Sequence, residues 1–181
     1  LHFVHDTEPV ITKSATAIST DKVLQTTQDA AIFDITASGT RNLFVSAISV
    51  LCTGAGASNT ELDDNAMEIK VDGAVKASSA ENAATCATGN GRAHTFSQPI
   101  EITAGTSKAF LVRFDTSATA GQWSTGESVL LRVNGTEGRT GGGLSWYYTS
   151  AGATQPANIP TLAAPATVSD SYPVDGPSLS F

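Results

Sequence analysis

Hydrophobic and polar positions alternate in short runs along most of this chain, and turn-forming residues separate the runs. Runs rich in Val, Ile, Phe, Thr and Tyr and bounded by Gly, Asn, Asp, Ser or Pro are typical of β-strands. This pattern predicts strands over residues 30–36, 41–52, 66–73, 94–102, 108–116, 127–135 and 144–150, and two short ones within 167–181. Helical periodicity is weak, and the best candidate helix is residues 78–86.

The fold class predicted from these runs is all-β. In the run 108–116, Phe110, Val112 and Phe114 share one face, while Leu111 interrupts the alternation and suggests that the strand is partly covered on both sides. A two-sheet antiparallel β-sandwich, Ig-like or jelly-roll, explains this best. We expect one such domain over residues 13–181, preceded by an extended N-terminal strand within residues 1–12.

The opening stretch LHFVHDTEPV, residues 1–10, also alternates as a β-strand does, but no turn and second strand follow at hairpin distance. The sequence leaves two interpretations open. The segment could be donated to the sheet of a neighbouring copy, or it could pair or fray at the edge of its own domain, with Pro9 ending the strand in either case. The residues of the candidate donor strand are Leu1, His2, Phe3, Val4 and His5.

Composition narrows the classes of partner. Charged residues make up 15% of the 181, below the usual figure of about 25%, and the net charge is −7. An acidic chain without a basic cluster is a poor partner for nucleic acid. No run approaches the ~20 apolar residues that span a bilayer, and the chain begins with Leu and not Met, so we expect a processed, exported protein at the cell surface or outside the cell.

Cys52 and Cys86 are the only cysteines. In an exported chain such a pair is expected to form a disulfide, here closing a loop rich in small residues. A metal or redox pair is the alternative, but no CxxC motif and no nearby His/Cys set at zinc spacing supports it. Asn134 begins an Asn-Gly-Thr glycosylation sequon, which has meaning only where the source organism glycosylates.

An acidic cluster gives a weak candidate calcium site. Glu61, Asp63 and Asp64 lie close together, with Asp72 near them, and oxygen-rich loops of this kind bind calcium in many exported proteins. EF-hand spacing is absent, so a solvated acidic loop is the preferred interpretation. Apart from this possible calcium, no cofactor is expected.

The sequence carries no catalytic motif, so we do not expect an enzyme. Ser145 lacks the second Gly of a nucleophile elbow, and two of the three histidines lie in the opening segment. Alternation places Trp146 and Tyr148 on one face and Tyr147 on the other. Core or subunit-interface packing is expected for Trp146, whereas an exposed aromatic row, with Trp123, would indicate sugar binding.

Three stretches carry a resemblance: RNLFVSAISVLCTG, PIEITAGTSKAFLVRFDTSATAG, and GESVLLRVNG followed by SWYY and PVDGPSLSF. Together they resemble Ig-like β-sandwich domains of bacterial and archaeal cell-envelope proteins, such as surface-layer and pilus proteins, over roughly residues 41–181. The resemblance implies scaffolding and assembly, with no catalytic residues to carry over.

With its additional leading strand, the chain also resembles subunits of extracellular filaments built by donor-strand exchange. We therefore expect a homopolymer, pilus-like or tubular, that serves adhesion, biofilm formation or cell connection. The alternatives are a monomeric carbohydrate-binding or adhesin module, with surface glycans as partners, and a viral capsid or decoration protein.

Overall fold

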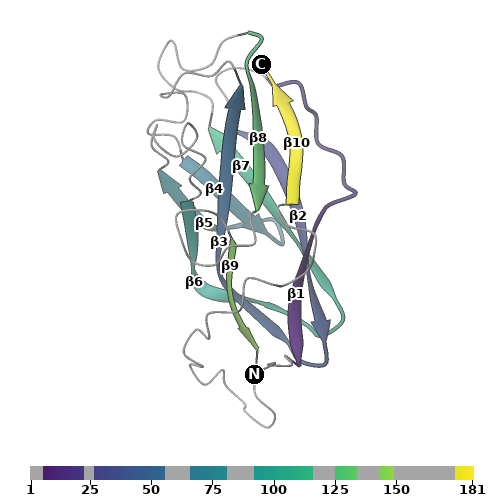
Figure 1. Cartoon of the computed structure of the whole chain (residues 1–181). Coiled ribbons are helices and arrows are strands. Elements are labelled where there is room, and N and C mark those ends of the chain that lie inside the picture. Colours follow the sequence, from purple (N-terminus) through teal and green to yellow (C-terminus); the bar gives the residue numbers. More distant parts are fainter. Residues whose placement is uncertain are drawn as a thin grey trace, which may run out of the picture.

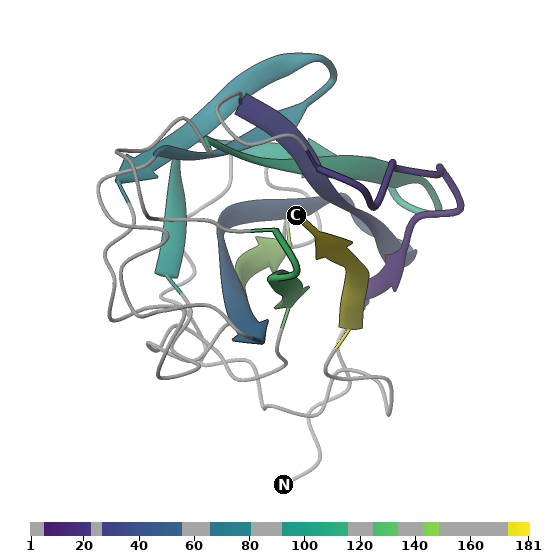
Figure 2. The same ribbon diagram turned by 90° about the horizontal axis from the view of Figure 1, so that it is seen from above.

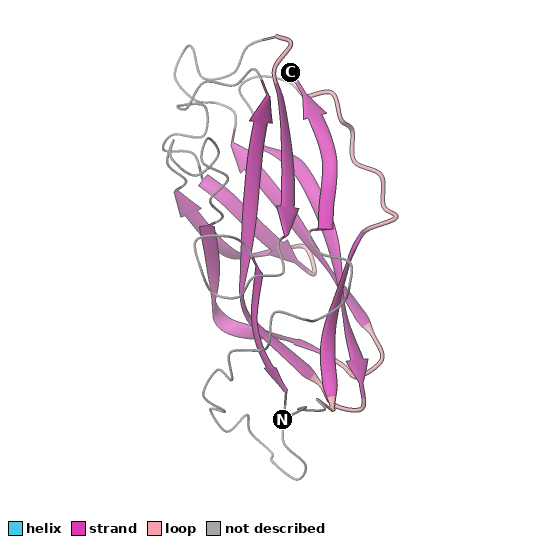
Figure 3. Ribbon diagram, in the orientation of Figure 1, coloured by secondary structure: helices cyan, strands magenta, loops and turns pink. Residues whose placement is uncertain are grey.

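The computed structural model of the chain describes residues 6–22, 27–55, 66–80, 92–115, 125–133, 143–148 and 174–181. Within these ranges every regular element is a β-strand, which confirms the predicted all-β class (Figure 3). The strands are β1 (Thr7–Lys13), β2 (Thr27–Gly39), β3 (Leu43–Ala55), β4 (Ala66–Val71), β5 (Ala74–Ala80), β6 (Arg92–Ile102), β7 (Ser107–Asp115), β8 (Ser128–Val133), β9 (Gly143–Tyr148) and β10 (Val174–Ser180). In these ranges there is no helix that could cross a membrane.

The strands form two antiparallel sheets of five strands each, which confirms the predicted β-sandwich. The first sheet has the order β1-β2-β7-β4-β5, and the second has the order β10-β8-β3-β6 with β9 also paired to β3 (Figure 1). Seen from above, the two sheets form two layers that face each other (Figure 2).

One edge of β3 is shared by two strands. β6 pairs with β3 from Leu43 to Val50, and β9 pairs with nearly the same residues, from Leu43 to Ser49, so β6 and β9 must lie on opposite edges of β3. β8 pairs with β3 from Val50 to Ala55 on the same edge as β9. β8 and β9 therefore lie end to end along β3, and β10 pairs with β8.

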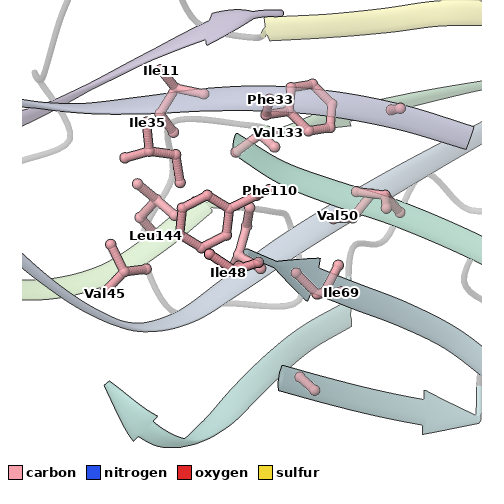
Figure 4. Packing of buried hydrophobic residues seen from close by; sticks show 14 of the residues in the cluster. Ile11, Phe33, Ile35, Val45, Ile48, Val50, Ile69, Phe110, Val133 and Leu144 are labelled. Atoms are coloured by element: carbon pink, nitrogen blue, oxygen red, sulfur yellow. The ribbon is translucent and has the colours of Figure 1, made fainter. Parts of the chain in front are cut away.

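The core lies between the two sheets and takes mostly alternate residues from the strands; the exceptions are the consecutive buried residues 30–31 of β2 and 47–50 of β3, which lie at register shifts. Ile11 and Ile35 of the first sheet lie opposite Val45 and Leu144 of the second in this layer (Figure 4). Each of these side chains is less than a tenth exposed. Burial of one such side chain stabilises the fold by about 1.5–3 kcal/mol, so the repeated alternation, and not any single contact, holds the sheets together.

Two strands differ from the expectations. β1 pairs with β2, so residues 7–12 of the opening segment form an edge strand of their own domain, as the second interpretation had it. β1 also contains Pro9, which was predicted to end the strand; Pro9 is tolerated because an edge strand needs a full set of ladder bonds on one side only. β5 was not predicted, because AVKASSA has few β-branched or aromatic residues. Its residues 78–80 are part of the range predicted as a helix, which is wrong for that part; residues 81–86 lie outside the described ranges.

The hairpin turn between β4 and β5 is formed by Asp72 and Gly73. Both residues have positive φ, 53° at Asp72 and 77° at Gly73, as a two-residue hairpin turn requires.

β10, which contains Pro177, is an edge strand of the second sheet, and its pairing with β8 shifts register between Asp175 and Ser178. Pro177 is tolerated there because an edge strand needs ladder bonds on one side only.

Candidate functional site

The candidate donor residues, Leu1 to His5, lie outside the described ranges, but the point where they join the fold is described. Asp6 and Thr7 lie at one end of the sandwich, where β1 pairs with the last residue of β2: Thr7 is opposite Gly39. The Asp6 carbonyl accepts a hydrogen bond of 3.0 Å from the Thr40 N–H. This bond is one residue beyond the end of β2 and is the last rung of the β1–β2 ladder.

Thr7 fixes the start of β1 to the turn between β2 and β3. Its side chain is fully buried, and its hydroxyl accepts a hydrogen bond of 2.7 Å from the Arg41 N–H. The hydroxyl hydrogen faces two carbonyl oxygens, those of Asp6 at 2.8 Å and Arg41 at 3.0 Å. The Arg41 guanidinium adds a weak, half-exposed ion pair with Asp6 at 3.7 Å. Sequence reasoning missed this junction, because an isolated Thr gives no signal of burial.

Gly39 allows β1 to lie this close to β2. Its φ is +147°, and a Cβ on it would lie 2.2 Å from the Asp6 carbonyl oxygen and 2.6 Å from the Thr7 Cα. Neither backbone atom can move without breaking the first rungs of the β1–β2 ladder. Only glycine fits there.

The aromatic residues of β9 divide between the two faces of the sheet, as the alternation predicts. Trp146 is 7% exposed and packs in the core, with the Tyr148 ring stacked against it at a centroid distance of 6.4 Å. This confirms core packing for Trp146, so β9 does not contribute an exposed Trp146–Tyr148 row for sugar binding. Trp123 lies outside the described ranges.

Tyr147 lies on the opposite face, where its ring stacks on Phe44 of β3. The ring centroids are 5.2 Å apart and the planes differ by 7°, as expected for cross-strand partners. Partial burial raises the pKa of Tyr147 above its usual value of 10.0, because the phenolate loses hydration. This pair rigidifies β9 against β3.

A connecting segment, residues 14–22, crosses from β1 to the edge of the second sheet. The Ser180 N–H of β10 donates to the Thr20 carbonyl at 2.9 Å, and the Lys22 N–H donates to the Ser180 carbonyl at 2.8 Å. The Lys22 ammonium donates to the Asp29 carbonyl at 2.6 Å. Burial lowers the pKa of Lys22, and the Asp29 charge opposes this effect. The outer edge of β10 is therefore paired at its end.

The other predicted site residues are mostly not described. Glu61, Asp63, Asp64, Cys86 and Asn134 lie outside the described ranges. Cys52 lies in β3 opposite Leu131 of β8, and its partner in the expected disulfide is not described. The disulfide, the sequon and most of the acidic cluster remain predictions.

Asp72 is described, and it lies in the β4–β5 turn. Its carboxylate is 64% exposed and forms an ion pair of 2.7 Å with Lys108 of β7, so it is already engaged with a cation. Within the described part of the chain, no three His, Cys, Asp or Glu residues lie close enough together to hold a metal ion.

No protein-family model and no curated protein matches this sequence.

Proposed function

We propose that the protein is a structural subunit of an extracellular filament and that each copy donates its first residues as a β-strand to the next copy. In this arrangement main-chain hydrogen bonds supply affinity, and alternating side chains supply register. The subunit performs no catalysis. Its task is to link copies into a pilus-like or tubular fibre for adhesion, biofilm formation or cell connection.

One observation carries the proposal: the strand-like pattern of LHFVHD continues past the last rung of its own sheet. β2 ends at Gly39, and the Asp6–Thr40 bond is the last that the β1–β2 ladder can offer. Thr40 and Arg41 then turn the chain towards β3. β2 therefore offers no further residue to pair with a strand formed before Asp6, and such a strand needs a different partner. A second copy of the chain supplies one.

The expected contributions of side-chain burial and hydrogen bonding are large enough to hold two copies together through such a strand. Seating Leu1 and Phe3 against apolar side chains contributes about 1.5–3 kcal/mol each, and each ladder hydrogen bond adds about 0.5–1.5 kcal/mol. A head-to-tail contact that does not close into a ring propagates without limit, and the product is a fibre.

Electron microscopy of the purified chain, intact and lacking residues 1–5, tests the proposal. The truncation leaves Asp6 and Thr7 in place, so we expect an unchanged melting temperature and far-UV spectrum. We expect fibres from the intact chain and none from the truncated one. Discrete particles from the intact chain would favour a monomeric binding module, closed shells would favour a capsid protein, and fibres from the truncated chain would rule out the donor role of this segment.

A further inference from the structure

We propose that the cleft between the β4–β5 turn and β6 is a binding site for a neutral saccharide. The cleft measures about 550 Å³, within the range of roughly 300–1,000 Å³ that is usual for small-molecule sites. Its lining comes mostly from the β4–β5 hairpin, β6 and β7. The inference goes beyond the proposed function, because it assigns the subunit a ligand other than its own copies.

The cleft lies where the edges of the two sheets meet. β5 is an edge strand of the first sheet and β6 is an edge strand of the second, and the two strands lie side by side (Figure 1). β1, which follows the proposed donor segment, is the opposite edge of the first sheet. The cleft is therefore separated from the donor strand by the width of that sheet.

A bulge in β6 shapes one wall of the cleft. Four residues of β6, 96–99, stand opposite the single residue Ser46 of β3, because the register shifts there. Phe96 stays buried in the core, whereas Ser97 and Gln98 are exposed and line the cleft. Bulges often lie beside binding sites, because they change the direction in which side chains point.

Three polar side chains of the cleft have unused hydrogen-bonding groups. Lys76, Ser97 and Gln98 are exposed, and in the described part of the chain no hydrogen bond or ion pair engages their side chains. An ammonium group donates hydrogen bonds, whereas a carboxamide and a hydroxyl both donate and accept them. Sugar hydroxyls also donate and accept, so a saccharide can pair with all three side chains.

Two carboxylates of the cleft are held in position by the fold. The Asn42 amide nitrogen donates to Glu101 Oε1 at 2.6 Å, and the Asn42 amide oxygen accepts a hydrogen bond of 3.0 Å from the Ala104 N–H. Asp72 is held by its ion pair of 2.7 Å with Lys108. Acceptors that are fixed in advance lose little side-chain entropy when a ligand hydroxyl binds to them.

The charges that line the cleft balance one another. Asp72 and Glu101 are negative, and Lys76 and Lys108 are positive, so the lining has no net charge. A phosphate group favours a cationic site, and a divalent cation favours an anionic one. A neutral ligand that forms hydrogen bonds with groups of both signs fits this lining best.

Apolar side chains provide a surface for the carbon atoms of a sugar ring. Val71 and Ile100 are buried and also line the cleft, and Val75, which is 47% exposed, lines it as well. Val75 is the only large hydrophobic side chain that is exposed among the described residues. The described lining contains no aromatic ring, so hydrogen bonds dominate, and we expect a dissociation constant on the order of 1 mM.

An extended peptide fits the cleft less well than a saccharide does. A peptide that adds to a sheet needs a regular edge with alternating N–H and C=O groups. At the cleft β6 is bulged, and its Pro99 has no N–H to offer. Lys76 of β5 is a residue type that protects sheet edges from such addition. A peptide is therefore the competing ligand in the experiment.

Saturation-transfer NMR on the full chain tests the inference, because it observes the small ligand whether the protein is monomeric or assembled. The probes are cellobiose, maltose and lactose, which are neutral, together with digalacturonic acid and tetra-alanine. We expect saturation of at least one neutral disaccharide, strongest at its ring C–H protons. Binding of no neutral disaccharide, or of digalacturonic acid or tetra-alanine alone, would overturn the inference.

Matched substitutions locate the bound saccharide. Glu101→Gln and Lys76→Ala change the cleft, and each should weaken binding by about tenfold, because a hydrogen bond to a charged group is lost. Glu8→Gln and Lys13→Ala make the same changes on β1, at the opposite edge of the sheet, and should leave binding unchanged. Equal effects of the cleft and β1 variants would overturn the inference.

The outcomes for this site and for the filament are independent. Saccharide binding by a chain that forms no fibres would contradict the proposed function alone. Fibres from a chain that binds no saccharide would contradict this inference alone.

Discussion

The Thr7 hydroxyl accepts a hydrogen bond from the Arg41 N–H, 34 residues later in the chain, at 2.7 Å. The side chain is fully buried, so water cannot replace Thr7 as the partner of Arg41. This bond ties the first strand to the turn between β2 and β3. It holds the point from which the candidate donor segment leaves the fold.

Thr7→Val keeps the shape of the side chain and removes its hydroxyl. We expect a loss of about 1–3 kcal/mol in the free energy of unfolding, because the buried Arg41 N–H loses its partner. Thr12→Val, at an exposed position of the same strand, is the control and should change stability by less than about 0.5 kcal/mol. Urea titrations of both variants measure the difference. Equal stability of the two would mean that Arg41 finds another partner.

Gly39→Ala should destabilise the fold more than alanine at another glycine with positive φ. The new Cβ at Gly39 would meet backbone atoms of Asp6 and Thr7, whereas a Cβ at Gly73 would meet nothing within 4 Å. Backbone strain alone costs on the order of 1–3 kcal/mol at either site, so the difference between the variants reports the collision. Amide hydrogen exchange should show lost protection along β1 in Gly39→Ala only.

Above about pH 10, the free energy of unfolding should depend on the ionisation of the Tyr147 phenol. Because its pKa is raised in the folded state, the folded protein keeps the phenol proton above pH 10.0 while the unfolded chain loses it. The folded state then binds more protons, and stability falls as pH rises through this range. Tyr147→Phe should flatten that part of the curve of unfolding free energy against pH. Tyr148→Phe controls for loss of a phenol hydroxyl in the same strand; parallel curves for wild type and Tyr147→Phe would contradict the prediction.

The ion pairs of Arg113 should contribute little to the free energy of unfolding. Arg113 on β7 lies between Asp29 at 2.8 Å and Glu68 at 3.3 Å, and the Asp29 side chain is 52% exposed. Pairs of this kind are typically worth 0.2–1 kcal/mol, so Arg113→Gln should lower the free energy of unfolding by about 1 kcal/mol or less. Phe110→Ala, in the core part of the same strand, should cost about 3–5 kcal/mol. Thermal unfolding of both variants at low and high salt distinguishes the two effects.

The sequence was sufficient to predict the β-sandwich because hydrophobic and polar residues alternate strongly along most of its strands. Phe110, Val112 and Phe114 face the core, as their spacing predicts, and Trp146 is buried for the same reason. β5 escaped prediction because alanine and serine carry little strand preference, and its place is set by the Asp72-Gly73 turn and by pairing with β4.

The junction at Thr7 and the position of β9 beside β8 could not be predicted from the sequence. The role of Thr7 depends on Arg41, which only the fold brings near. The position of β9 depends on its register against β3, where it pairs with Leu43–Ser49 while β8 pairs with Val50–Ala55. The donor role of the opening segment stays a prediction from its alternation, and the sequence could not show that β2 ends at Gly39.

The short ladder between β1 and β2 also determines how a fibre of such subunits would carry mechanical load. A pull on Asp6 along the axis of β1 acts at right angles to the hydrogen bonds that join Thr7–Lys13 to β2. All rungs resist that shear at once, whereas a sideways pull would open them one after another. A thread linked through this strand, as proposed, would be strongest along its own length.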